Sequence, residues 1–276
     1  MTICVVIVVF NKEISSSVTC SRLLRNGKYN ILVVDNSTKA NKNQEYCEKQ
    51  DISYLSMGGN KGLSKAYNAA IEYCHDADVI VFMDDDTEVP DVYFKKLNQA
   101  VNDNPDIDIF APIIKGQDGV VYSPNNYCFL KNHLVSSPIK DVKSDRFNAI
   151  SSCLAVRKTV FDNYRYNEKL FVDEVDHCFC REQRKRRKRF GIINVVINQN
   201  FHQRELNIQP DKAWAREKIR ITDIFRHARI IGGGIYILLA FIKGCGLGVQ
   251  IGKRSKSFKV MLKAIGLSFT LVFLDR

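Results

Sequence analysis

Three short runs of apolar, mostly β-branched residues, each followed by polar side chains, constrain the fold of this chain more than any other feature. The runs and their polar ends are 3–10 with Asn-Lys-Glu at 11–13, 31–34 with Asp-Asn-Ser at 35–37, and 79–83 with Asp-Asp-Asp at 84–86. Runs that are apolar at every position are typical of strands buried on both faces of a parallel sheet. Because open α/β sheets bind ligands beyond the carboxyl ends of their strands, the polar ends predict a binding site at that edge.

The segments between and after these runs predict helices and further strands. Residues 61–75 and 90–102 place apolar side chains at roughly helical spacing, and residues 192–197 form one more strand-like run. Residues 115–148 predict loops and short strands, and residues 155–171 predict a short helix followed by a loop. This alternation predicts an α/β fold with a mostly parallel central sheet flanked by helices.

Charge divides the chain into two parts. Residues 1–180 contain 20 basic and 24 acidic side chains, whereas residues 181–276 contain 21 basic and 6 acidic ones. The composition changes again after Pro210. We therefore expect one large domain over residues 1–210 and a basic, apolar helical region over residues 211–276.

The N-terminal residues and the cysteines indicate a compartment. No basic residue precedes the first apolar run, so the sequence predicts no secretory signal. The chain has nine cysteines, most of them isolated, and in a cytoplasmic protein these are expected to be reduced thiols. His177-Cys178-Phe179-Cys180 offers too few separated donors for a zinc site and favours buried thiols.

The acidic triplet Asp84-Asp85-Asp86 is the sharpest local feature. Adjacent carboxylates repel one another, and hard oxygen ligands suit Mg²⁺ or Mn²⁺, which take further ligands from water and substrate phosphates. In an extended segment Asp84 and Asp86 point to one side and Asp85 to the other. The triplet therefore predicts a cation site that holds a diphosphate, and the alternative is a solvated acidic turn before Pro90.

Five motifs in order give the chain a resemblance to a known family. They are VVIVVFNKE, ILVVDNST, NKGLSKAYNAAI, VFMDDDTEVP and LFVDEVDHCFCRE. Over about residues 3–205 the chain resembles the family 2 glycosyltransferases, which have the GT-A fold, and most closely the rhamnosyltransferase-like branch of bacterial surface-polysaccharide assembly. The resemblance implies a nucleotide-sugar-binding half over residues 1–110 and an acceptor-side half over residues 111–210.

The resemblance also implies roles for individual residues. It implies donor contacts, including a nucleobase contact by Asp35, for Asn11, Asp35, Asn60, Gly62, Asn68, Asp84 and Asp85. It implies that Mg²⁺ or Mn²⁺ is held by Asp84, Asp86 and His202. The alternative is that the asparagines and Asp35 are structural turn formers and that His202 is a polar loop residue.

The late acidic motif is expected to supply the catalytic carboxylates, Asp173, Glu174 and Asp176. An inverting transfer needs a general base within reach of the acceptor hydroxyl. The resemblance to an Asp-x-x-Asp motif favours Asp173 as the base, with Glu174 second and Asp176 orienting the acceptor or the loop. An acidic helix start is the alternative, because carboxylates stabilise a helix N-terminus.

The C-terminal third carries a basic run and two apolar stretches. The run at 181–189 is compatible with a nucleic-acid patch, a solvated helix face or attraction to anionic lipid. Residues 230–251 and 257–274 are apolar, but a lysine and several glycines interrupt the first, and Lys256, Lys259 and Lys263 share one face of the second. We expect helices that lie in a membrane interface rather than span it. A buried core helix or a dimer contact is the alternative.

These features together predict a metal-dependent, inverting glycosyltransferase of cell-surface polysaccharide biosynthesis. The expected donor is a nucleotide-diphosphate sugar, and the expected acceptor is a hydroxyl of a lipid-linked saccharide at the inner face of the cell membrane. Expected partners are these substrates and an anionic membrane surface, with a homodimer as a further option and no nucleic acid. The alternatives are a nucleotidyltransferase on a similar sheet and a basic nucleic-acid-binding protein.

Overall fold

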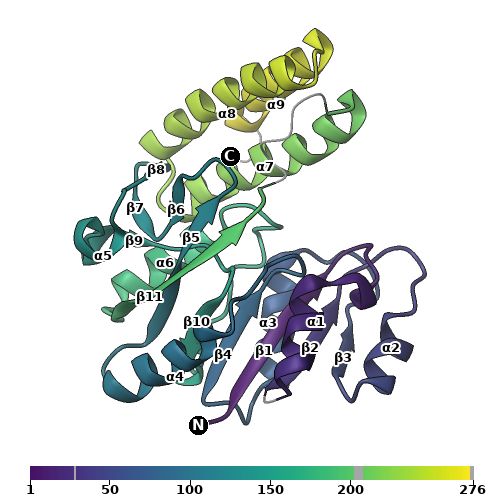
Figure 1. Ribbon diagram of the computed structural model, residues 1–276. Helices are drawn as coiled ribbons and strands as arrows, with labels where there is room; N and C mark the ends of the chain where they lie inside the picture. The colour runs from purple at the N-terminus through teal and green to yellow at the C-terminus, as the bar shows by residue number, and fades with distance from the viewer. Residues whose placement is uncertain (28, 202–207, 274–276) are drawn as a thin grey trace.

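The computed structural model describes residues 1–27, 29–201 and 208–273, and it contains a mixed β-sheet between two layers of helices (Figure 1). The strands of the main sheet are β1 (Ile3–Val9), β2 (Asn30–Asp35), β3 (Ser53–Ser56), β4 (Val79–Met83), β5 (Ile109–Gly116), β6 (Val121–Ser123), β10 (Leu154–Arg157) and β11 (Phe190–Gln199). Their order is β11-β5-β10-β4-β1-β2-β3, with β6 paired to β5. Only β10 and β6 run antiparallel to their neighbours, so the predicted α/β class with a mostly parallel sheet is confirmed.

Helices cover both faces of this sheet because both faces of its central strands are apolar. One face carries α1 (Val18–Asn26), α2 (Asn43–Lys49) and α4 (Val92–Asp103), and the other carries α3 (Leu63–Tyr73) and α6 (Val175–Lys185). Along β1, Val5 packs in the first layer and Val6 in the second, and both are fully buried. Because successive side chains of a strand point to opposite faces, the one apolar run of β1 contributes to two separate apolar cores.

Shorter elements connect the sheet to the C-terminal region. A small second sheet contains β7 (Asn125–Cys128), β8 (Lys131–His133) and β9 (Phe147–Asn148), in the order β8-β7-β9. Near it lie α5 (Pro138–Asp141) and the single turn Ser144–Arg146. The other single turns are Ile14–Ser16, which packs against α1 and α2, and Lys158–Phe161, which follows β10. Tyr127 and Leu130 of this region pack into the same apolar cluster as Phe225 of the C-terminal helices.

Three long helices, α7 (Pro210–Ile230), α8 (Ile235–Arg254) and α9 (Phe258–Phe273), pack together at one end of the molecule (Figure 1). The glycines of α8 allow α9 to approach closely: a Cβ on Gly252 would lie 2.6 Å from Cβ of Met261, and one on Gly248 would lie 3.2 Å from Cβ of Ala264. By length and composition, α8 alone among the described residues could cross a membrane, and 33% of its apolar window is buried.

One expectation from the sequence is wrong, and another is only partly correct. The short helix predicted in residues 155–171 is present as the 3-10 helix Lys158–Phe161, but it follows the strand β10, which was not predicted. Residues 154–156 of this strand are fully buried, so their apolar side chains carry no periodicity that separates strand from helix. The cysteines are not all reduced, because Cys4 of β1 and Cys74 at the end of α3 form a disulfide.

The basic run at 181–189 is engaged largely within the protein. Lys188 Nζ lies 2.9 Å from Oδ1 of Asp108, and Arg189 pairs with Asp106. Lys185 lies 3.1 Å from Glu182, and the Arg184 guanidinium donates to a backbone carbonyl. These intramolecular partners favour a structural role for the run over a nucleic-acid patch.

Candidate active site

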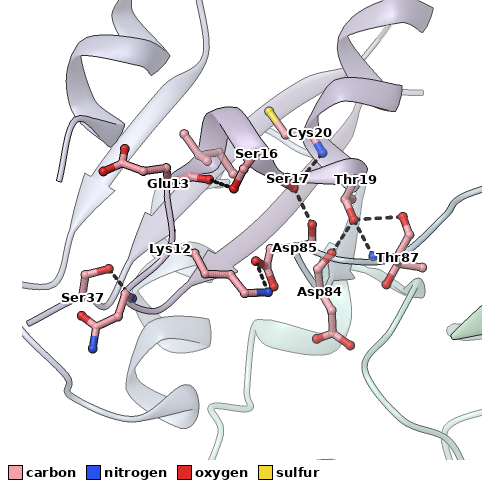
Figure 2. A network of polar contacts seen from close by, with 12 residues as sticks. Lys12, Glu13, Ser16, Ser17, Thr19, Cys20, Ser37, Asp84, Asp85 and Thr87 are labelled. Atoms are coloured by element: carbon pink, nitrogen blue, oxygen red, sulfur yellow. Dashed lines mark hydrogen bonds and ion pairs between the residues drawn. The ribbon is translucent and has the colours of Figure 1, made fainter. Parts of the chain in front are cut away.

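The acidic triplet follows β4 in a turn that is braced by the start of α1 (Figure 2). The Thr19 hydroxyl donates to the backbone carbonyl of Asp84 at 2.6 Å, and the Ser17 hydroxyl donates to that of Asp85 at 2.6 Å. The backbone N–H of Thr87 donates to Thr19 Oγ1 at 2.9 Å. Because these bonds use backbone atoms of the turn, they fix its shape and leave the carboxylates to other partners.

The carboxylates of the triplet have different partners. Oδ2 of Asp84 accepts hydrogen bonds from the Ser152 hydroxyl and from Nε2 of Gln199, the latter at 2.7 Å. Asp85 forms an ion pair of 2.8 Å with Lys12, which follows β1, and Asp86 is half-buried in the same turn. Burial raises the pKa of Asp84; the bonds from Ser152 and Gln199 oppose this shift, and the charges of Asp86 and Asp85 add to it.

Asp176, in the first turn of α6, lies close to Asp84. Oδ1 of Asp176 accepts a hydrogen bond from the Ser151 hydroxyl, and the neighbouring Ser152 donates to Asp84, so one serine pair joins the two carboxylates. Burial raises the pKa of Asp176 to about 6, with Ser151 opposing the shift and the charges of Asp84 and Asp173 adding to it. A carboxyl group that titrates in this range suits general acid–base chemistry.

Asp173 and Glu174 are instead bound to the C-terminal helices. The Asp173 carboxylate is held by both terminal nitrogens of Arg216 on α7, with 2.9 Å between Nη2 and Oδ1. Glu174, whose side chain is 5% exposed, lies 2.8 Å from Nζ of Lys243 on α8 and 2.9 Å from Nδ1 of His227 on α7. Burial would raise the pKa of Glu174, but Lys243 and the neighbouring histidines hold it well below its usual range.

Asp223 on α7 fixes the backbone that leads into the acidic motif. Its fully buried carboxylate accepts the N–H groups of Phe171, Val172 and Asp173 at 2.8–3.1 Å. The carbonyl of Phe171 accepts in turn from the N–H of Leu63, and a Cβ on Gly62 would lie 2.7 Å from the Phe171 ring. The segment is therefore held between the start of α3 and the middle of α7.

We expect Asp223→Asn to lower the free energy of unfolding by about 1–3 kcal/mol, because an amide nitrogen would then face buried N–H groups that lose their acceptor. Chemical denaturation measures this. Asp211→Asn, at the exposed start of the same helix, is the matched control and should change stability by less than about 0.5 kcal/mol. A variant with the stability of the wild type would show that this clamp is not needed.

The residues expected to contact the donor mostly hold loops in the structure. Oδ1 of Asn11 accepts the N–H groups of Thr38 and Lys39, and Asn68 binds the backbone N–H and carbonyl of Tyr166. Asn60 accepts hydrogen bonds from the Asn36 side chain and from the N–H of Gly62, both at 3.3 Å. Their donor contacts stay predictions.

Asp35, at the end of β2, is 3% exposed and already has three donors. These are the N–H of Ser37, the Asn43 amide and the Tyr54 hydroxyl, at 2.9–3.1 Å. Burial would raise the pKa of Asp35, but these hydrogen bonds lower it, so the group is held as a carboxylate. Its proposed contact with a nucleobase stays a prediction.

His202, expected as a metal ligand, lies outside the described residues. Within the described residues no cluster of three or more His, Cys, Asp or Glu side chains could hold a metal ion by itself.

A pocket of about 1060 Å³ lies away from the candidate site, at the amino ends of β1 and β2, where Thr2 and Asn30 line it. Lys12, Ser152 and Gln199 lie at the site and were not predicted, although Lys12 and Gln199 stand at the polar ends of β1 and β11.

The sequence and the fold both match known proteins. The sequence model described as Glycosyl transferase family 2 matches residues 4–165. Over 199 residues the chain is 29% identical to a dTDP-rhamnosyl transferase, RfbF, of Shigella flexneri. Over 190 residues it is 25% identical to Agl10 of Haloferax volcanii, a low-salt glycan biosynthesis hexosyltransferase. The matched regions cover 70% and 64% of this chain but 65% and 61% of the relatives' lengths.

Solved structures with low sequence identity share the fold. The structure of TarS 1–349 from S. aureus in complex with UDP-GlcNAc aligns with a TM-score of 0.56 at 14% identity, over 99% of this chain and 82% of that one. The structure of GalNAc-T7 with UDP, GalNAc and Mn²⁺ aligns with a TM-score of 0.58 at 15% identity, over 98% of this chain and 57% of that one.

Proposed function

This chain belongs to glycosyl transferase family 2, and from that premise we propose that it transfers a sugar from a nucleoside-diphosphate donor to a hydroxyl group of a saccharide. The observation that carries the proposal is the placement of Asp84 and Asp176 on either side of the pair Ser151-Ser152, at the carboxyl end of β4. The names of the two relatives, a dTDP-rhamnosyl transferase and a hexosyltransferase of glycan biosynthesis, support a role in glycan assembly.

A divalent cation, Mg²⁺ or Mn²⁺, fits the donor set of the acidic turn. Oε1 of Gln199 is buried without a partner among the described residues, and it belongs to the amide that donates to Asp84. Since no described cluster could complete a site, Asp84 and Asp86 would hold the ion together with phosphate oxygens, as is common for Mg²⁺. The bound ion would neutralise the charge of the departing diphosphate. The Mn²⁺ in the GalNAc-T7 structure is consistent with such a cofactor.

Asp176 is the best candidate for the base of an inverting transfer, in place of Asp173. Within the described residues it has no cationic partner, whereas Asp173 and Glu174 are held by Arg216, His227 and Lys243. In the reaction the acceptor oxygen bonds to the anomeric carbon as the bond from that carbon to the diphosphate breaks. Asp176 takes the hydroxyl proton.

An acceptor-dependent release of nucleoside diphosphate is the expected activity. We would incubate the protein with dTDP- and UDP-sugars, Mn²⁺ and a panel of free and lipid-linked saccharides, and measure diphosphate release and glycan product. We expect dTDP-rhamnose to be among the active donors and a lipid-linked saccharide to be the best acceptor. Release of inorganic pyrophosphate from a nucleoside triphosphate and a sugar phosphate would instead identify a nucleotidyltransferase.

A further inference from the structure

The outer faces of α8 and α9 form an apolar surface that the proposed sugar transfer does not use. Six large apolar side chains of these helices are between 53% and 68% exposed, and we call them the apolar ridge: Ile235, Leu238, Ile242, Phe258, Leu262 and Phe269. On each helix the spacing places them along one stripe. The ring centroids of Phe241 on α8 and Phe269 on α9 lie 4.8 Å apart. Because Phe241 is next to Ile242 of the ridge, the stripes on the two helices adjoin.

The inner face of α8 is committed to the rest of the protein. Lys243 pairs with the buried Glu174 at 2.8 Å, and Gly248 and Gly252 lie against α9. If α8 crossed a membrane, it would leave Glu174 without this cation, and an uncompensated buried charge is costly. The apolar ridge is therefore an exposed face of a folded helical region (upper part of Figure 1).

The charge of the helix pair indicates what would cover this ridge. Residues 235–273 contain six Lys or Arg residues and no Asp or Glu. Lys253, Lys256 and Lys259 are exposed at the turn between α8 and α9. A second copy of the chain would bring cations against cations, whereas an anionic partner with an apolar interior would satisfy both the lysines and the ridge.

We propose that the apolar ridge docks on the surface of an anionic lipid bilayer. The aromatic and aliphatic side chains enter the boundary between headgroups and acyl chains, and the lysines of the α8–α9 turn contact the headgroups. This goes beyond sugar transfer, because it needs neither donor nor acceptor. It also holds the candidate site beside a membrane, since α8 binds Glu174 and α7, which packs against α8, binds Asp173.

Co-sedimentation of the full chain with lipid vesicles tests the proposal. We expect binding to vesicles in which about a third of the lipid is phosphatidylglycerol, weak binding to pure phosphatidylcholine, and release by salt. The double variant Lys256→Glu/Lys259→Glu should weaken binding by about 25-fold, at about 1 kcal/mol per basic residue. Phe258→Ser/Leu262→Ser should weaken it by at least about tenfold through lost apolar burial.

Matched controls lie on α4, at the other end of the molecule in Figure 1. Lys95→Glu/Lys96→Glu makes the same charge change at exposed positions, and Val92→Ser removes an exposed apolar side chain, so both should bind vesicles like the wild type. Equal losses in the control and ridge variants would overturn the proposal. The proposal would also be overturned if the wild-type protein does not bind anionic vesicles but forms dimers in sedimentation velocity, and if Phe258→Ser/Leu262→Ser dissociates those dimers. Thermal stabilisation by nucleoside diphosphate, measured on the same samples, separates a failure here from a failure of the transferase proposal.

Discussion

Replacing Asp176 by Asn should lower kcat by roughly 10²–10⁴ while leaving nucleoside diphosphate affinity within about twofold of the wild type. The reason is that Asp176 is the acidic side chain that reaches Asp84 through the pair Ser151-Ser152 without a cationic partner among the described residues. Because burial raises its pKa to about 6, the wild-type rate should fall as the pH drops through about 6, where the base becomes protonated. Steady-state kinetics between pH 5 and 8, with calorimetry for binding, measures both effects.

The raised pKa of Asp176 also affects stability, and this effect has the opposite pH dependence to the rate. A folded-state pKa above the ordinary value of 3.8 means that ionisation of Asp176 opposes folding, so its contribution to stability is lost as the pH rises from about 4 to 6. Asp176→Asn removes this cost and should be more stable than the wild type at pH 7.5, by up to about 3 kcal/mol. An Asn variant that is fully active, or that loses stability at that pH, would exclude this role for Asp176.

The neighbouring carboxylates are the controls. Glu174→Gln should lower the free energy of unfolding by about 3–5 kcal/mol, because it leaves Lys243 and His227 without their buried anion. Asp173→Asn breaks the ion pair with Arg216 and should mainly displace the segment 171–174 that leads into α6. If Asp173→Asn instead abolishes transfer while stability and donor binding are intact, Asp173 is the base, as the sequence resemblance favours.

Asp86→Ala should lower kcat/KM by about 10²–10³, corresponding to the several kcal/mol that a cation supplies to a departing phosphate. Nucleoside diphosphate binding by this variant should no longer respond to Mn²⁺. Glu88→Ala, two residues along the same loop and exposed, removes the same charge and should retain the metal response. Transfer by Asp86→Ala that stays dependent on Mn²⁺ would exclude Asp86 as a ligand.

The central strands were predictable because their local sequence and their tertiary environment agree. The runs that become β1, β2 and β4 are apolar at nearly every position, and each is buried by helices on both faces. The strand β5 was not predicted from the sequence because Pro112 interrupts its run of apolar residues. Proline has no N–H to donate within a sheet. Pro112 is tolerated in β5 because the hydrogen-bonded pairing of β5 with β10 covers only Ile109 and Phe110 and ends before Pro112.

The site was predictable only where its residues stand next to one another in sequence. The triplet at Asp84 is a local signal, but its partners Ser152 and Gln199 come from 68 and 115 residues further along the chain. The roles of Asp173 and Glu174 could not be separated from that of Asp176, because Arg216, His227 and Lys243 reach them through the packing of α7 and α8. Local spacing does not report such contacts.

Calorimetric titration of UDP and dTDP into the wild-type protein, with Mn²⁺ and with a chelator, tests most directly whether the acidic turn of residues 84–86 holds a cation on a diphosphate. We predict that at least one of the two nucleotides binds about tenfold or more tightly with Mn²⁺. Equal affinity in Mn²⁺ and in chelator for both nucleotides would contradict the account.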